Sequence, residues 1–197
     1  MFTLKHIQRV LVVCGANACR SPMAEAALQE VLDRRFRMDT GMPVFVVSSA
    51  GLADGDPSIP DNETDLRMAP HAMTLMDRYY RVDLSERRSR PVWTLPKEER
   101  AGIIVAISPK IAAVLREELP KPDAWDLSPP RKSPHILVMN EASGGVPDPY
   151  YGYGDLTDYQ LCLFRIQAAL PDIAEKIGEI VRKENREREM SFLSMHG

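Results

Sequence analysis

The sequence predicts a single three-layer α/β domain, in which helices cover both faces of a four-stranded parallel sheet. Three observations indicate this fold. Four short runs are almost wholly apolar, as strands are when both faces of a sheet are covered. Segments with helical periodicity lie between them, which is typical of parallel strands joined by right-handed crossovers. The 197 residues, 44% of them hydrophobic, suffice for one core of ordinary size.

The first half of the chain contains two expected strands, each followed by an expected helix. An apolar run without Gly or Pro predicts a strand over residues 9–13. Residues 22–35 follow with apolar side chains at core spacing, which predicts a helix. A second apolar run predicts a strand over residues 44–49. The helix expected over residues 65–80 has an apolar stripe, and Pro70 interrupts its pattern.

The second half repeats the alternation of strand and helix. The third strand is expected over residues 103–107. Ser108 then suits the cap of a helix over residues 109–119, with Pro109 at its first position. The fourth apolar strand is expected over residues 135–139.

The chain is expected to end in a helix over residues 156–186, with Leu and Ile in helical register. Because proline lacks an N–H and clashes with the preceding turn, Pro171 is expected to kink this helix or split it in two. We expect the folded domain to comprise residues 1–185. Residues 186–197 then form a charged C-terminal tail, as a solvated helix that frays toward its end.

Three longer loops are expected between these elements. Residues 53–62 lack periodicity, and loops of this length are often functional. Residues 83–90 are rich in arginine, which indicates a solvated face or, alternatively, a positive rim near an anionic substrate. Residues 144–152 combine glycines, prolines and tyrosines in a stiff loop after the fourth strand.

The composition excludes several classes of protein. The net charge of −3 predicts no general affinity for nucleic acid. No apolar stretch is long enough for a membrane span, and the N-terminus lacks a signal peptide's apolar core, so a cytoplasmic location is expected. The three cysteines lack C-x-x-C spacing and clustered histidines, so we expect neither a disulfide framework nor a metal site.

The nonapeptide C-G-A-N-A-C-R-S-P, from Cys14 to Pro22, joins the first strand to the first helix. Ser21 is expected to cap that helix, and Pro22 suits its first turn. The loop then presents backbone N–H groups beside a positive helix end, and such an end binds anions such as phosphate or sulfate. Asn17 lies within this loop, and asparagine adopts a positive φ more readily than most other non-glycine residues.

The residues of this loop indicate phosphoryl chemistry. Loop N–H groups and a helix N-terminus favour the thiolate form of Cys14, which is the nucleophilic form. Arg20 carries a planar fork of donors that matches two oxygens of a phosphoryl group. Ser21 is placed to donate its hydroxyl to the sulfur. The alternative is that Cys14 is simply a buried residue at the end of a strand.

Cleavage of a phosphate monoester also requires a proton for the departing oxygen, and Asp148 is the candidate donor. It lies between two prolines, after the fourth strand, so its loop can reach the same sheet edge as Cys14. Tyr150 and Tyr151 follow it and could stack on an aromatic substrate. The alternative is a surface turn, because Pro-Asp-Pro is common in turns.

Three stretches in this order resemble the low-molecular-weight protein tyrosine phosphatases: the nonapeptide, S-S-A-G after the second strand, and D-P-Y-Y-G before the last helix. The resemblance extends from about Val10 to about Leu170. It implies that Cys14 is the nucleophile, Arg20 the phosphoryl clamp and Asp148 the general acid and then base. It implies a phosphorylated protein as substrate and no cofactor.

The resemblance also implies roles for neighbouring residues. Ser21 would be the hydrogen-bond partner of the thiolate, while Asn17 and Ser49 would hold the shape of the loop. Cys19 would trap an oxidised nucleophile as a reversible disulfide. The loop residues that bind phosphate would be Gly15, Ala16, Asn17, Ala18, Cys19 and Ser21.

Several positions depart from the family pattern. Gly15 precedes Ala16, so that glycine stands one place earlier than usual. Ala18 is smaller than the usual Ile or Thr, and Arg87 stands where a His is common. The substrate is therefore open between phosphotyrosine and phosphoarginine. An inactive phosphoprotein-binding module is a further alternative, and arsenate reduction is disfavoured because Cys162 is the only additional cysteine.

Overall fold

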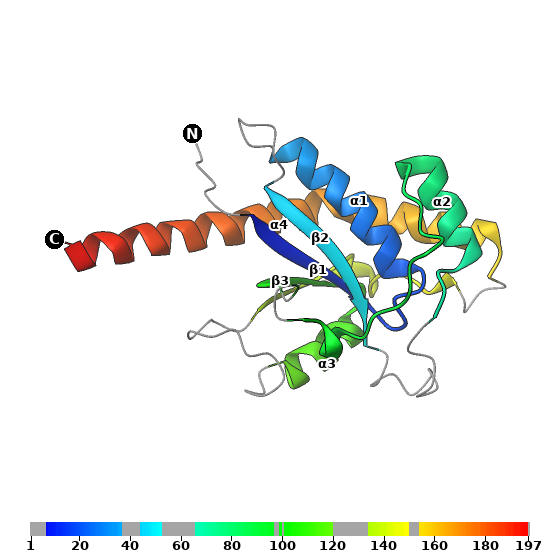
Figure 1. Cartoon of the computed structure of the whole chain (residues 1–197), viewed down its shortest axis with the longest axis horizontal. Coiled ribbons are helices and arrows are strands. Elements are labelled where there is room, and N and C mark those ends of the chain that lie inside the picture. The colour runs from blue at the N-terminus through cyan, green and yellow to red at the C-terminus, as the bar shows by residue number, and fades with distance from the viewer. Residues whose placement is uncertain are drawn as a thin grey trace.

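Four parallel strands form one sheet in the order β2-β1-β3-β4, which confirms the predicted fold class (Figure 1). The computed structural model describes residues 7–36, 44–52, 66–96, 99, 101–119, 134–149 and 154–196. The strands are β1 (Gln8–Cys14), β2 (Phe45–Gly51), β3 (Ile103–Ala106) and β4 (His135–Val138). β1 lies between β2 and β3, so its carboxyl end at Cys14 opens near the middle of the sheet edge.

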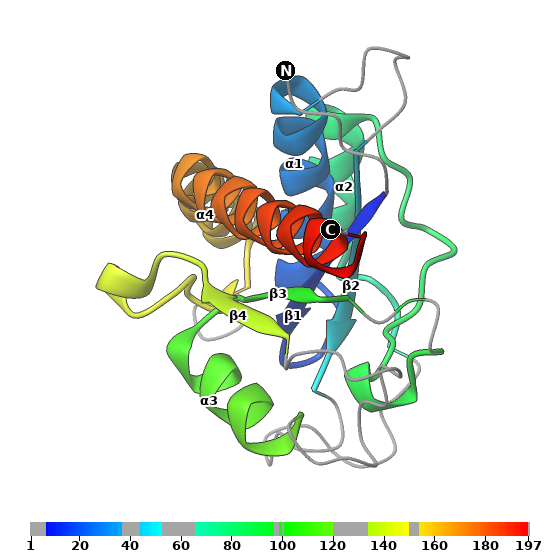
Figure 2. The ribbon, with the colours of Figure 1, turned by 90° about the vertical axis from the view of Figure 1, so that its left-hand side faces the viewer.

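Helices cover the two faces of the sheet unequally. The helices are α1 (Arg20–Arg35), α2 (Pro70–Tyr80), α3 (Pro109–Glu118) and α4 (Leu156–His196), with short 3-10 turns η1 (Val92–Thr94) and η3 (Glu141–Ser143). α1, α2 and α4 lie on one side of the sheet and α3 on the other (Figure 2). Accordingly, Val10 and Val12 belong to the larger apolar core, while Leu11 and Val13 belong to the smaller one.

The start of α2 corrects one sequence-based expectation. The helix begins at Pro70, five residues later than expected, and the described part of the preceding segment is not helical, since Arg67 bridges to Arg88. Pro70 is therefore the first helical residue and does not interrupt the helix. A proline is well suited to that position, because its missing N–H would have no partner in the first turn.

Pro171 does not split α4, so one of the two outcomes expected for this proline, a divided helix, is wrong. The helix runs without a break from Leu156 to His196, across the domain boundary expected after residue 185 (Figure 1). Pro171 lies on the exposed side, where water can satisfy the carbonyl oxygen that loses its intrahelical donor. The C-terminal part of α4 projects away from the sheet.

Some expectations fall outside the described residues. These are the loop over residues 53–62, the Pro-rich segment over residues 121–133, and both Tyr150 and Tyr151. In the described part of the chain, no helix is both long and apolar enough to span a bilayer. The same part contains no group of three or more His, Cys, Asp or Glu residues that could hold a metal ion.

Candidate active site

The nonapeptide forms a tight loop between the last residue of β1, Cys14, and the first residue of α1, Arg20. Asn17 has a φ of 54°, which confirms the positive φ expected there. The end of β2 packs directly on the loop, because a Cβ at Gly51 would lie only 2.6 Å from the carbonyl oxygen of Gly15. Glycine at position 51 therefore allows the two backbones to meet.

The sulfur of Cys14 lies at the floor of this loop. The residue is 2% exposed, and its Sγ accepts a hydrogen bond from the backbone N–H of Asn17 at 3.2 Å. The Ser21 hydroxyl lies 3.0 Å from the same Sγ. Both groups can donate to a sulfur anion, so the environment suits a thiolate.

Ser21 has a different structural role from the helix cap that we expected. α1 begins at Arg20, two residues earlier than expected, and its N-cap residue, Cys19, makes no side-chain cap. The Ser21 hydroxyl is buried and contacts the Ala50 carbonyl oxygen at 3.2 Å as well as the sulfur. It carries a single hydrogen, which can go either to Ala50 or to a thiolate at Cys14.

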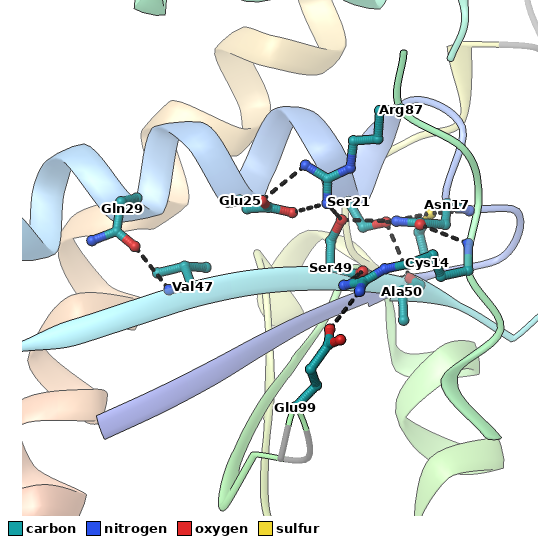
Figure 3. Close-up of polar contacts among 11 residues, drawn as sticks. Cys14, Asn17, Ser21, Glu25, Gln29, Val47, Ser49, Ala50, Arg87 and Glu99 are labelled. Atoms are coloured by element: carbon teal, nitrogen blue, oxygen red, sulfur yellow. Dashed lines mark hydrogen bonds and ion pairs between the residues drawn. The ribbon is translucent and has the colours of Figure 1, made fainter. Parts of the chain in front are cut away.

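The side chain of Asn17 connects the loop to its supports (Figure 3). Its Nδ2 donates to Ser21 Oγ at 2.9 Å and to Ser49 Oγ at 2.8 Å. Its Oδ1 accepts from the backbone N–H of Arg90 at 3.0 Å. Asn17, Ser21 and Ser49 are all fully buried, so these bonds are shielded from water.

Arg20 and Asp148 form an ion pair, although they are 128 positions apart in the chain. Their side chains are 14% and 18% exposed. Burial disfavours the charge of Arg20, but the neighbouring Cys14 and Asp148 outweigh it and raise the pKa of the guanidinium. Its Nε is buried and has no hydrogen-bond partner in the described part of the chain, so it is a donor available to an anion.

The other two cysteines are held as neutral thiols. Burial raises the pKa of Cys19 well above its ordinary value of 9.0, and the neighbouring Cys14 raises it further. Burial likewise raises the pKa of Cys162 to about 12. Cys162 interacts electrostatically with Arg20, Asp148 and Cys14, so α4 brings it beside the site. The helical register of Cys162 predicts that its side chain is buried, but nothing in the sequence predicts that it lies near the other site residues.

The arginines expected to form either a solvated face or a positive rim have more specific contacts. Arg87 binds the carboxylate of Glu25 through both terminal nitrogens and also donates to Ser49 Oγ. Arg90 pairs with Glu99 and contacts the Ser49 carbonyl oxygen. Sequence reasoning missed Glu25 because nothing in the sequence relates it to a residue 62 positions away.

Several backbone N–H groups of the loop are free to donate hydrogen bonds. In the described residues, the backbone N–H groups of Gly15, Ala16, Ala18 and Cys19 make no hydrogen bond. They lie beside the N-terminus of α1, whose first turn contains no acidic residue. With Arg20 they provide a positive cradle around the sulfur, and Asp148 places a carboxyl group in the same site.

Comparison with known proteins identifies relatives that span most of the chain. The family model described as low molecular weight phosphotyrosine protein phosphatase matches residues 9–185. A curated protein of Streptomyces coelicolor, named low molecular weight protein-tyrosine-phosphatase, is 28% identical over 178 residues. That alignment covers 88% of this chain and 95% of the relative.

Solved structures share the fold at lower sequence identity. The low molecular weight protein tyrosine phosphatase of T. tengcongensis has a TM-score of 0.59 and 23% identity, over 86% of this chain and 99% of that chain. Wzb of Vibrio vulnificus, in complex with benzylphosphonate, has a TM-score of 0.62 and 20% identity over the same shares. The YwlE arginine phosphatase of Geobacillus stearothermophilus has a TM-score of 0.58 and 21% identity, over 89% of this chain and 96% of that chain.

Proposed function

The chain belongs to the low molecular weight phosphotyrosine protein phosphatase family, a family of cysteine-based phosphatases, and on that premise we propose that it hydrolyses protein phosphotyrosine. The observation that carries the proposal is the arrangement around one sulfur. Cys14 Sγ is in contact with two donors at the floor of an amide-rich loop, and Arg20 and Asp148 meet in the same site.

In the first step, the phosphoryl group of the substrate replaces Asp148 as the partner of Arg20. The guanidinium and the loop N–H groups hold the equatorial oxygens, where charge is spread in the transition state. The thiolate of Cys14 attacks phosphorus in line, so that an S–P bond forms while the P–O bond to the leaving group breaks. Asp148, once separated from Arg20, takes up a proton from solvent and transfers it to the departing oxygen.

In the second step, water attacks the cysteinyl-phosphate. Asp148, now a carboxylate, takes a proton from that water, a P–O bond forms and the S–P bond breaks. The thiolate leaves with the Ser21 hydroxyl and the Asn17 N–H as its hydrogen-bond donors. Inorganic phosphate is released and Cys14 is again a thiolate. Asp148 loses the proton taken from water to solvent when it pairs with Arg20 again.

Phosphoarginine is the second candidate substrate. One observation favours it: some of the structural relatives are titled arginine phosphatases. The same steps would cleave a P–N bond, with the leaving guanidine in place of the phenolate. Either substrate would be a phosphorylated protein, and the need for a reduced nucleophile fits the cytoplasm.

Turnover of p-nitrophenyl phosphate, followed by side-by-side turnover of phosphotyrosine and phosphoarginine peptides, tests the proposal. We expect the wild type to hydrolyse phosphotyrosine faster and vanadate to inhibit it. Cys14→Ser should lose turnover and keep its melting temperature. Activity that persists in Cys14→Ser would overturn the mechanism, while wild-type protein that binds phosphopeptides without turnover would indicate a binding module.

A further inference from the structure

Arg87 and Glu25 form an ion pair that contacts Ser49, one of the residues that support the phosphate-binding loop (Figure 3). Arg87 Nη1 donates to Glu25 at 2.8 Å, and Nη2 donates both to Glu25 and, at 3.0 Å, to Ser49 Oγ. We propose that this pair is a positioning device for the nucleophile, which acts through Ser49 and does not touch substrate. The proposal rests on the phosphatase function proposed above.

A continuous series of hydrogen bonds joins this pair to the sulfur. Ser49 Oγ accepts from Arg87 and, at 2.8 Å, from Asn17 Nδ2. The same amide nitrogen donates to Ser21 Oγ at 2.9 Å, and that hydroxyl lies 3.0 Å from Cys14 Sγ. Each neutral side chain between Arg87 and the sulfur thus has partners on both sides, so a displacement at Ser49 is transmitted to Asn17 and Ser21.

The fork of an arginine suits this role. One guanidinium spans the Glu25 carboxylate and the Ser49 hydroxyl, which a lysine ammonium cannot do with the same planar geometry. The pair also joins three parts of the fold, because Glu25 lies on α1, Ser49 on β2 and Arg87 on the segment after α2. The phosphate-binding loop leads into α1 and contacts both β2 and the segment after α2.

The charge balance argues against a direct role for Arg87 in binding substrate. Its side chain is 23% exposed and that of Glu25 is 19% exposed, so the two charges neutralise each other with little access to solvent. Arg20, in contrast, has a buried Nε without a partner in the described residues. An incoming phosphoryl group therefore finds its donor at Arg20, while Arg87 is already engaged.

The test is a double-mutant cycle between Arg87 and Ser49. We expect Arg87→Met to lower kcat for p-nitrophenyl phosphate by about tenfold or more while KM changes by less than about threefold, since the nucleophile is misplaced and the anion cradle is retained. In a Ser49→Ala background, Arg87→Met should lower kcat by less than about twofold, because the route to the loop is already broken. Arg87→Lys, the conservative variant, should recover part of the loss.

Arg35→Met is the matched control, because Arg35 also joins a glutamate, Glu175, but on the surface between α1 and α4. It should leave kcat unchanged. The proposal is overturned if Arg87→Met and Arg35→Met have equal kcat values, or if the losses of Arg87→Met and Ser49→Ala simply multiply. Melting temperatures identify variants that do not fold. If Arg87→Met does not fold, the kcat of Arg87→Lys is compared with that of Arg35→Met instead.

A second measurement separates this proposal from the proposed function. The rate at which iodoacetamide alkylates Cys14, followed by peptide mapping, reports on the sulfur whether or not the protein turns over substrate. We expect that rate to change by about threefold or more in Arg87→Met and not in Arg35→Met. A wild type without phosphatase activity would overturn the function alone, whereas equal alkylation rates would overturn the positioning role.

Discussion

The guanidinium of Arg20 is bonded to the carboxylate of Asp148, so the two charged groups that flank the sulfur bind each other in the free protein. A phosphoryl group has to separate them before Arg20 can hold its oxygens and Asp148 can face the leaving group. The free-energy cost of separating the two groups lowers the affinity of the site for every anion.

Replacing Asp148 should therefore affect turnover and anion binding in opposite directions. We expect Asp148→Asn to lower kcat by about 100-fold or more, because the proton donor is lost. Inorganic phosphate should inhibit this variant at about fivefold lower concentration, because the carboxylate that pairs with Arg20 is no longer there to compete. Initial rates with phosphate as competitive inhibitor measure both effects.

Asp172→Asn serves as the control for this prediction, since Asp172 pairs with Lys176 on the surface of α4. It should change neither kcat nor the inhibition constant. If phosphate inhibits Asp148→Asn no better than the wild type, the ion pair does not compete with substrate.

The three cysteines should differ sharply in reactivity. The raised pKa values of Cys19 and Cys162 keep both as buried thiols at neutral pH. Iodoacetamide at pH 7 should therefore label Cys14 at least about tenfold faster than either, and phosphate should protect it. Peptide mapping by mass spectrometry measures the three rates, and preferential labelling of Cys19 would contradict the prediction.

Burial of Cys162 should make the protein less stable in alkali. Its pKa is raised from 9.0 to about 12, so the folded state retains a proton that the unfolded state loses. The stability contribution is fully present below pH 9 and is lost as the pH rises toward 12. From pH 7 to pH 10 this single group should lower the free energy of unfolding by about 1 kcal/mol.

Urea unfolding of the wild type and Cys162→Ala at both pH values isolates this contribution. The variant is expected to be less stable at pH 7, because a buried side chain is shortened, but it should lose less stability on going to pH 10. Equal losses in the two proteins would show that Cys162 does not carry the effect.

The close approach of Gly51 to the loop should be sensitive to one methyl group. A Cβ there would lie 2.6 Å from Gly15 O and 2.9 Å from the backbone of both Ala16 and Asn17. We expect Gly51→Ala to displace the loop and lower kcat/KM for p-nitrophenyl phosphate by about tenfold or more. Gly102→Ala is the matched control, because no atom beyond the adjoining residues lies within 4 Å of its added Cβ, and it should retain full activity.

Much of the fold was predictable because it depends on local patterns. The apolar runs gave the four strands within one or two residues, and Ser108 with Pro109 marked the start of α3 correctly, since the Ser108 hydroxyl accepts from the N–H of Ile111. One error was the N-cap of α1, which is Cys19 and not Ser21, and the others concern prolines. Pro70 begins a helix and Pro171 lies inside one, and which of these a proline does depends on its exposure and on tertiary packing.

By itself, the sequence determined the strand, loop and helix around Cys14 and Arg20, because seven consecutive residues carry both the backbone pattern and the chemistry. It also determined the positive φ of Asn17, which follows from a local preference. Only the tertiary structure decided that Asp148 pairs with Arg20, that Arg87 and Glu25 support Ser49, and that Cys162 lies beside the site. These contacts depend on the order of the strands and the packing of helices on them, and no periodicity or spacing along the chain specifies which distant charges will meet.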